Sequence, residues 1–237
     1  MNDRPFRIVE AIYPGMTQLD FTAPHTFFSR IPNVETIVAS EAGGEITSDG
    51  GLIFAGTRPL AEIDRCDLLF VPGGLAATEA SNNAAFMREV KRLAAGARYL
   101  TSVCTGSLIL AAAGLLTGKR AACHWAWRDM LSLFGAIPDE GRVVRDGNII
   151  TGGGVTAGVD FALVVAAEIA GAQVAQALQL GLEYAPAPPF NAGRPETAPP
   201  EVLSEVKRRM EAILPKRRAE AQAAAARLAS SPQYAGV

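Results

Sequence analysis

A single cysteine lies where a predicted strand turns directly into a predicted helix. Residues 99–103 are apolar and β-branched enough for a buried strand, and residues 108–113 are helix formers. Only residues 104–107 separate the two, so the turn must be sharp and must hold the Cys104 side chain above the sheet. Hydrolases hold a nucleophilic serine at such a turn, and a helix N-terminus favours the thiolate form of a cysteine. The arrangement predicts a reactive thiol at Cys104; the alternative is a buried cysteine that only packs.

A cysteine nucleophile needs donors for developing negative charge, and two backbone amides are candidates. The first is the amide of Thr105, at the start of the predicted helix. The second is that of Gly74, because Pro72-Gly73-Gly74 ends the neighbouring predicted strand and glycine permits close backbone approach. An ordinary strand-to-loop turn would use the same glycines.

Two side chains compete for the role of proton partner to the thiol. Asp20 follows the turn after the first predicted strand, at a carboxyl end of the sheet. Its alternative role is the N-cap of the next helix, and one carboxylate can serve both purposes. His124 follows Cys104 by twenty residues and can form a Cys–His pair, but its neighbour Trp125 and the helix that follows equally fit a capping or packing histidine.

The other residues of these types are expected to be structural. His25 lies one turn beyond Asp20, and Asp160 falls in the first turn of a predicted helix, where a carboxylate stabilises the helix dipole. Cys66 and Cys123 lack a strand-to-helix turn and are expected to be inert.

Strands and helices alternate along the chain, which favours a doubly wound α/β fold with a mostly parallel sheet and helices on both faces. Ligands of such folds bind beyond the carboxyl ends of the strands, where Gly74 and Cys104 are expected. The predicted strands are 6–13, 35–39, 68–71, 99–103, 142–145 and 148–151, the predicted helices are 20–30, 83–95, 125–134 and 156–170 with a further helix to 182, and 45–59 is a predicted hairpin excursion.

We predict one α/β domain over residues 1–200 and a helical tail over 201–237, packed on the domain or on a partner subunit. The Pro-rich stretch 185–200 is a long loop, and the tail offers too few helices for a DNA-binding helix-turn-helix. Pro215 breaks the helical pattern of the tail.

Composition narrows the classes of partner. The net charge of −2 gives no electrostatic case for nucleic acid or a membrane surface, and no apolar run is long enough to span a bilayer. Three cysteines at unrelated spacings and two histidines predict neither disulfides nor a metal site. The N-terminus does not read as a signal peptide, which favours a reducing cytoplasm.

Three motifs resemble those of the ThiJ/PfpI superfamily: SVCTGS at 102–107, VPGG at 71–74 and TGGG at 151–154. The resemblance implies a flavodoxin-like fold, usually dimeric, built around a cysteine at a nucleophile elbow.

One branch, the isonitrile hydratases, is more similar. The shared motifs are LDFTAPH at 19–25, CTGSL at 104–108, HW at 124–125, VVRDGN at 143–148 and EYAPAPPFNAG at 183–193. This resemblance implies hydration of isonitriles to N-substituted formamides through a cysteine thioimidate, without a cofactor. Cys104 would be the nucleophile, Asp20 the proton-transfer group and Thr105 the residue that positions the thiol. Other branches place histidine after the cysteine or glutamate at the position of Asp20. The alternatives are a glyoxalase-like or deglycase-like enzyme and a non-catalytic redox sensor.

Overall fold

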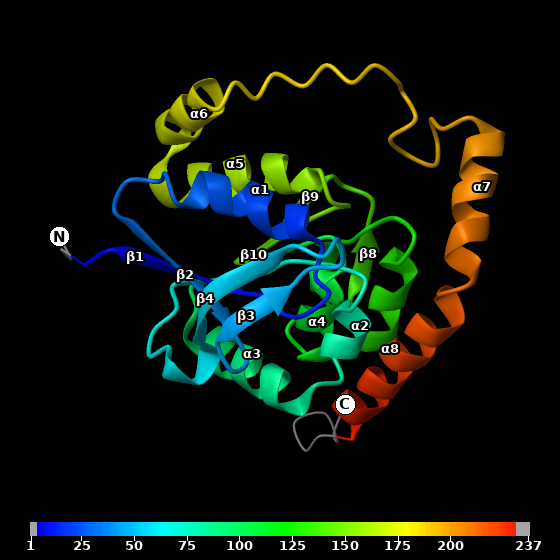
Figure 1. Cartoon of the computed structure of the whole chain (residues 1–237), viewed down its shortest axis with the longest axis horizontal. Coiled ribbons are helices and arrows are strands. Elements are labelled where there is room, and N and C mark those ends of the chain that lie inside the picture. Colours follow the sequence, from blue (N-terminus) through cyan, green and yellow to red (C-terminus); the bar gives the residue numbers. More distant parts are fainter. Residues whose placement is uncertain (1–3, 231–237) are drawn as a thin grey trace.

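A computed structural model describes residues 4–230 and contains an eight-stranded mixed sheet (Figure 1). Its strand order is β3-β4-β2-β1-β5-β6-β10-β9, in which β1, β2, β5, β6 and β10 are parallel neighbours. The strands are β1 (Phe6–Ala11), β2 (Val34–Ser40), β3 (Gly44–Thr47), β4 (Ile53–Pro59), β5 (Leu68–Val71), β6 (Tyr99–Val103), β9 (Val143–Asp146) and β10 (Ile149–Gly152). This is the predicted doubly wound, flavodoxin-like sheet.

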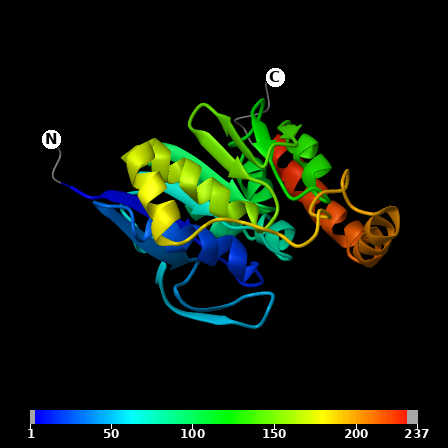
Figure 2. The same ribbon diagram turned by 90° about the horizontal axis from the view of Figure 1, so that it is seen from above.

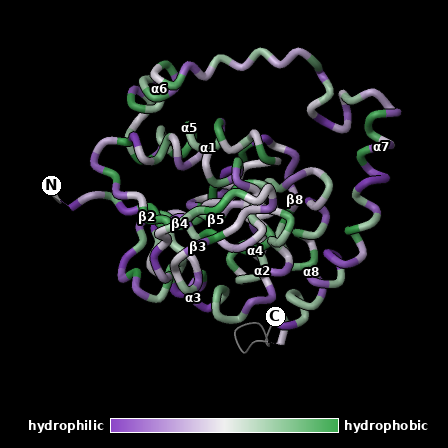
Figure 3. Tube along the Cα trace, in the orientation of Figure 1, coloured by the Kyte–Doolittle hydropathy of each residue, from purple (hydrophilic) through white to green (hydrophobic). Residues whose placement is uncertain are grey.

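Alternating strand residues divide the core between the two faces of the sheet, because successive side chains of a strand point to opposite sides. Ile8, Leu68 and Phe70 pack with helices on one face, whereas Val9, Leu69 and Val71 pack on the other. Strand β5, at the centre of the sheet, is entirely apolar and buried (Figure 3). Such a run is typical of a parallel strand buried on both faces.

Helices cover both faces, as Figure 2 shows from a second direction. One face carries α1 (Gln18–Phe28), α5 (Ala157–Ala170) and α6 (Ala172–Gly181). The other carries α2 (Ala77–Ala80), α3 (Ala84–Gly96), α4 (Gly106–Ala112), the 3₁₀ helix η2 (Arg128–Phe134) and the C-terminal helix α8 (Leu214–Ala229), and a short 3₁₀ helix η1 (Leu60–Glu62) follows β4.

Several elements differ from the sequence prediction. A separate two-stranded parallel sheet joins β7 (Arg120–Ala122) to β8 (Ile137–Asp139), and neither strand was predicted. The predicted helix at 125–134 is a 3₁₀ helix that begins only at Arg128. The tail forms two helices, α7 (Pro200–Glu211) and α8, because Pro215 is tolerated in the first turn of the second helix.

The Pro-rich segment runs as an extended loop between α6 and α7, at opposite ends of the molecule (Figures 1 and 2). Helix α8 packs on the domain through Ala221, Ala224 and Leu228, whereas α7 has no buried residue. The boundary proposed near residue 200 stays a prediction, and residues 231–237 of the predicted tail lie outside the described residues. Among residues 4–230, every helix is too short or too polar for a membrane span.

Candidate active site

Cys104 occupies the predicted elbow between β6 and α4. Its φ of +58° lies in the left-handed region, which is uncommon for a residue with a side chain and is typical of strained functional turns. Its amide donates to the carbonyls of Gly152 (3.0 Å) and Gly153 (2.8 Å), so the end of β10 holds the turn in place. Gly106 lets the helix start against β5, because a Cβ there would lie 2.2 Å from the Val71 carbonyl oxygen.

Asp20 lies in the first turn of α1 and is completely buried. The alternative role as N-cap is wrong, because Thr17 occupies the cap position and Asp20 lies inside the helix. Neither carboxyl oxygen of Asp20 has a hydrogen-bond partner of good geometry among residues 4–230. Burial raises the pKa of Asp20 to about 7, although the nearby Cys104 thiol and Gly73 backbone favour the ionised form and limit the rise. Asp20 therefore changes charge near neutral pH.

Gly73 is the point at which the site residues converge. A Cβ on Gly73 would lie 2.5 Å from the Thr105 amide nitrogen, 2.6 Å from Asp20 Oδ2 and 2.7 Å from Cys104 Cβ. No real side chain tolerates such contacts, so the bare face of this glycine is what lets the acid, the thiol and the amide come together. The sequence predicted that the Gly73-Gly74 pair lies at the site, but it named the amide of Gly74, and not Gly73, as the group that contributes to the chemistry.

The Gly74 amide has a different partner from the one we predicted. It donates to the Thr105 hydroxyl at 2.9 Å, and that hydroxyl lies 3.0 Å from the Gly74 carbonyl. This amide is thus already satisfied and does not offer a free donor to the reacting group. Gly74 is needed for close approach, because a Cβ there would lie 2.4 Å from Met16 Cα.

Every carbonyl of the turn at residues 72–75 accepts a hydrogen bond. The Tyr13 hydroxyl donates to the Pro72 carbonyl (3.1 Å), and the Thr17 amide donates to that of Gly73 (3.0 Å). The Thr105 hydroxyl serves the Gly74 carbonyl, and a guanidinium nitrogen of Arg217 donates to that of Leu75 (2.5 Å). Four donors from different parts of the chain therefore hold this turn. The hydroxyl of Thr105 is one of them, which supports Thr105 as a residue that positions the turn beside the thiol.

The thiol of Cys104 is not held as a thiolate, contrary to the expectation from the helix N-terminus. Burial, with only 5 % of the residue exposed, and the neighbouring Asp20 charge raise its pKa well above the ordinary value. The backbone of Val155 and Thr105 favours the thiolate, but burial outweighs it. Above about pH 7 the pair thus holds one proton on sulfur with an ionised carboxylate beside it, and below that pH the carboxyl group is protonated as well. The two groups titrate together.

His124 has a local structural role. Its Nδ1 accepts a hydrogen bond from the Ala126 amide at 3.2 Å, and its ring stacks on Trp125 with centroids 5.6 Å apart. Burial lowers the pKa of His124 to about 4, so the ring is neutral at physiological pH. Within residues 4–230 no hydrogen bond joins it to Cys104, whereas Asp20 is a titratable group that lies near the thiol.

The remaining candidates have structural surroundings. His25 Nδ1 lies 2.7 Å from Glu10 Oε2, and Asp160 pairs with Arg142 in the first turn of α5. Cys66 and Cys123 are buried, and burial raises the pKa of each thiol to about 12. Within the described chain, no three His, Cys, Asp or Glu side chains gather as a metal site requires.

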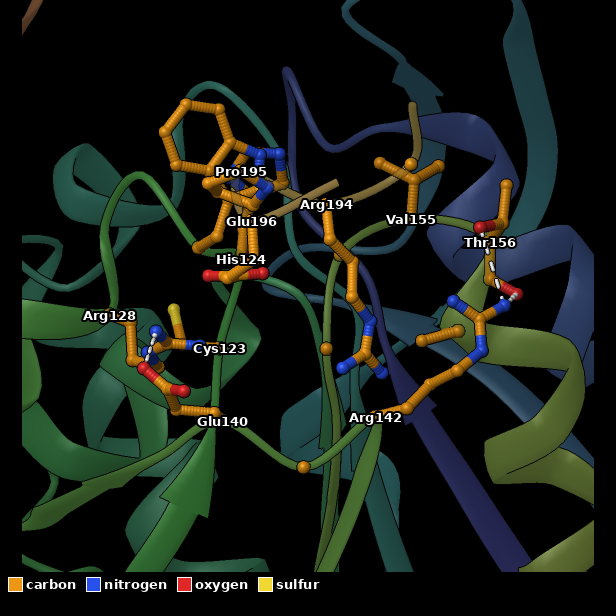
Figure 4. Close-up of a pocket in the computed structure, with 16 residues that line it drawn as sticks. Cys123, His124, Arg128, Glu140, Arg142, Val155, Thr156, Arg194, Pro195 and Glu196 are labelled. Atoms are coloured by element: carbon orange, nitrogen blue, oxygen red, sulfur yellow. Dashed lines mark hydrogen bonds and ion pairs between the residues drawn. The ribbon is translucent and has the colours of Figure 1, made fainter. Parts of the chain in front are cut away.

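A cavity of about 250 Å³ adjoins the elbow (Figure 4). Three of its wall residues, Cys123, Gly153 and Val155, are also neighbours of Cys104. Its far wall comes from the Pro-rich loop, and the Arg194 side chain points into the space between His124 and Arg142. Sequence reasoning did not place residues 193–196 at the site, because nothing local in a Pro-rich loop indicates where it returns to the domain.

The fold and the site define a class: a flavodoxin-like α/β protein with a buried cysteine at a nucleophile elbow and a carboxyl group beside it. The chain belongs to the DJ-1/PfpI family, whose sequence model matches residues 7–168. The resemblance found in its motifs is thereby confirmed.

Known proteins similar to this chain include an isonitrile hydratase from Pseudomonas putida, with 45% identity over 217 residues, 92% of this chain and 95% of that protein. A solved ThiJ/PfpI family protein from Pseudomonas syringae has a TM-score of 0.88 and 41% identity, covering 93% of this chain and 90% of the other. The Drosophila melanogaster protein dj-1beta is 25% identical over 172 residues, 71% of this chain and 92% of that protein.

Proposed function

We propose that this protein is an isonitrile hydratase that converts isonitriles to N-substituted formamides. The observation that carries the proposal is the meeting of Asp20 and Cys104 at the bare face of Gly73. The similarity to the Pseudomonas putida isonitrile hydratase, which extends over nearly the whole of both chains, supports the same substrate class.

The reaction starts from the thiol and the carboxylate. Asp20 takes the proton from Cys104 as the sulfur attacks the terminal carbon of the isonitrile. Asp20 then returns this proton to that carbon, which gives a covalent thioimidate with a C–S bond. The pKa of about 7 suits Asp20 to both steps, because a group that titrates near the working pH exchanges protons readily in either direction.

Water completes the reaction. The ionised Asp20 removes a proton from a water molecule, whose oxygen attacks the thioimidate carbon. Asp20 passes this proton to the nitrogen, the C–S bond breaks, and the proton of the added hydroxyl returns through Asp20 to the sulfur as the formamide leaves. The Thr105 amide faces the same bare side of Gly73 and is our candidate donor to the negative charge that forms there. Water and the groups of the chain account for every atom and proton in this scheme.

We place the substituent of the isonitrile in the cavity beside the elbow. The cavity shares wall residues with the surroundings of Cys104, so a linear N≡C group at the sulfur can extend into it. Substitution of Arg194 by alanine should raise KM for isonitriles with long substituents and leave small ones unchanged. Equal effects on both would argue against this placement.

Two assays separate this proposal from the alternatives. Alkyl and aryl isonitriles and methylglyoxal are supplied to the same preparation, and formamide and hydroxy acid are quantified. Formamide alone supports the hydratase, whereas turnover of methylglyoxal alone indicates a glyoxalase-like or deglycase-like enzyme. Turnover of neither, with ready oxidation of Cys104, indicates a sensor.

We further propose that the protein is a homodimer in a reducing cytoplasm. Leu180 and Phe190 are 83% and 80% exposed, and α7 buries no residue against its own domain, so a second copy can cover these surfaces. The free cysteines suit a compartment that keeps thiols reduced.

Light scattering tests the dimer. It should give twice the chain mass of 24.9 kDa, and Phe190→Ser should lower the measured mass. A wild-type protein of single-chain mass would rule out the dimer.

A further inference from the structure

Arg217, from the C-terminal helix α8, is a buried cation without an ion pair. Only 6 % of the residue is exposed, and among residues 4–230 no carboxylate forms an ion pair with it. Four charged residues are buried in this part of the chain. Glu10 and Glu89 have ion pairs, whereas Asp20 and Arg217 do not. Because a buried charge is costly unless other groups offset it, and the raised pKa of Asp20 already accounts for that residue, Arg217 requires an explanation of its own.

The contacts of Arg217 join it to the turn beside the nucleophile. Its guanidinium lies over the Trp127 ring, with Cζ 4.4 Å from the ring centroid, and donates to the Leu75 carbonyl at 2.5 Å. Leu75 directly follows Gly73 and Gly74, the residues that contact Asp20, Cys104 and Thr105. A residue far along the sequence thereby holds one end of the active-site turn.

The charges that act on Arg217 come from the same region. Burial lowers the pKa of Arg217 and is the largest effect on it. Glu220, on its own helix, and Asp49 favour its positive charge, and so would the ionised forms of Tyr13 and Cys104. The positive charge of Arg217 disfavours protonation of His124 and so adds to the effect of burial in lowering the pKa of His124. In contrast, the negative charges of Asp20 and Cys123 disfavour ionisation of the Cys104 thiol. Arg217 is thus a cation that holds the turn at Leu75 and interacts favourably with an ionised Cys104.

We propose that Arg217 is a positioning residue for Cys104, which fixes the turn at Leu75 and offsets the negative charge that develops on the sulfur. No carboxylate pairs directly with Arg217, and the negative charge that forms on the sulfur during reaction adds to the charges of Glu220 and Asp49 that offset this buried cation. Arg217 lies beyond residues 7–168, so this role belongs to the C-terminal helix and not to the matched family region. The inference deepens the proposed function and rests on the assigned nucleophile.

The test is the pH dependence of alkylation of Cys104 by iodoacetamide, in which the sulfur forms a C–S bond and iodide leaves. This readout reports the thiol itself and needs no isonitrile. The variants are Arg217→Met, Arg217→Gln, which keeps an N–H donor for Leu75, and Arg217→Lys, which keeps the charge. The control is Arg218→Met, because Arg218 is on the same helix and pairs with Asp129 at the surface. Peptide mass spectrometry confirms the site of labelling.

The two neutral variants should raise the apparent pKa of Cys104 by about one unit, equivalent to about tenfold slower alkylation near neutral pH. Arg217→Lys should shift it less, and the control should not shift it. An unchanged pKa in Arg217→Gln, folded by circular dichroism, would overturn the proposal, as would equal shifts in the Gln and Lys variants. If the Arg217→Met variant does not fold, the comparison of Arg217→Gln with Arg217→Lys tests the proposal alone. Wild-type protein that alkylates as expected but hydrates no isonitrile would contradict the proposed function and leave this inference standing.

Discussion

Asp20 and Cys104 approach the same bare face of Gly73, one from the first turn of α1 and the other from the elbow after β6. The Gly73 Cβ position is 2.6 Å from Asp20 Oδ2 and 2.7 Å from Cys104 Cβ. Strands β1, β5 and β6 are parallel neighbours, so their carboxyl ends bring these three residues together beside the point where the strand order reverses. The chemistry we propose depends on this convergence.

Gly73→Ala should therefore abolish most activity. The added methyl group must displace the acid, the thiol or the Thr105 amide, and displacement of about 1 Å at a reacting centre can cost about 100-fold in rate. Steady-state kinetics with a folded variant check this result. Gly96→Ala is the control, because its Cβ would meet nothing within 4 Å. Near-normal turnover by Gly73→Ala would show that the three groups do not act together.

The rate should rise with pH through about 7. Asp20 must be ionised to accept the thiol proton, and burial has raised its pKa to about 7. Below that pH both groups are protonated and kcat/KM should fall. Asp20→Asn should lower kcat by about 100- to 10,000-fold, the range of general acid–base catalysis. A pH–rate profile without an acid limb near 7 would exclude Asp20 as the group that controls the reaction.

The same carboxyl group should lower the stability of the fold at high pH. Its pKa is higher in the folded protein than the ordinary 3.8, so the native state binds a proton more tightly than the unfolded state does. The contribution of Asp20 to stability is then full below about pH 4 and is lost as the pH rises through 7. Asp20→Asn removes this effect. The free energy of unfolding of the variant, relative to that of wild type, should therefore be higher at pH 8 than at pH 4 by at most about 4 kcal/mol. Urea unfolding at both pH values measures the difference, and an equal difference at each pH would contradict the raised pKa.

His124→Asn should keep the pH dependence of the reaction. The neutral ring accepts a hydrogen bond from the Ala126 amide, and the asparagine carbonyl can accept the same bond. The loss of rate should stay well below the roughly 100-fold that removal of a proton-transfer group costs. Loss of the limb near pH 7 in this variant would instead make His124 the proton partner.

The sequence was most informative where local pattern decides structure. The strands Leu68–Val71 and Tyr99–Val103 were predicted to the residue, because each is a short apolar run that ends at Pro72 or at the cysteine turn. Strands β7 and β8 have three residues each and are defined by pairing with one another across the intervening 3₁₀ helix, which no local pattern reveals.

The site shows the same limit. Sequence spacing found Cys104 and Asp20 but could not show which glycine faces them, or that burial outweighs the helix N-terminus in setting the thiol pKa. Arg217 was missed because an arginine in a charged, alanine-rich helix is ordinarily exposed. Only the packing of α8 against Trp127 buries it.

The most direct test of the central claim is the rate of formamide formation from an aryl isonitrile by wild type, Cys104→Ala and Cys66→Ala, all shown to be folded. Wild type and the Cys66 control should turn over alike, and Cys104→Ala should form no formamide above the uncatalysed rate. Asp20→Asn should form only slowly an adduct on Cys104 that is heavier by the mass of the isonitrile, and should release little formamide from it. Formamide production by folded Cys104→Ala at the wild-type rate would contradict the account.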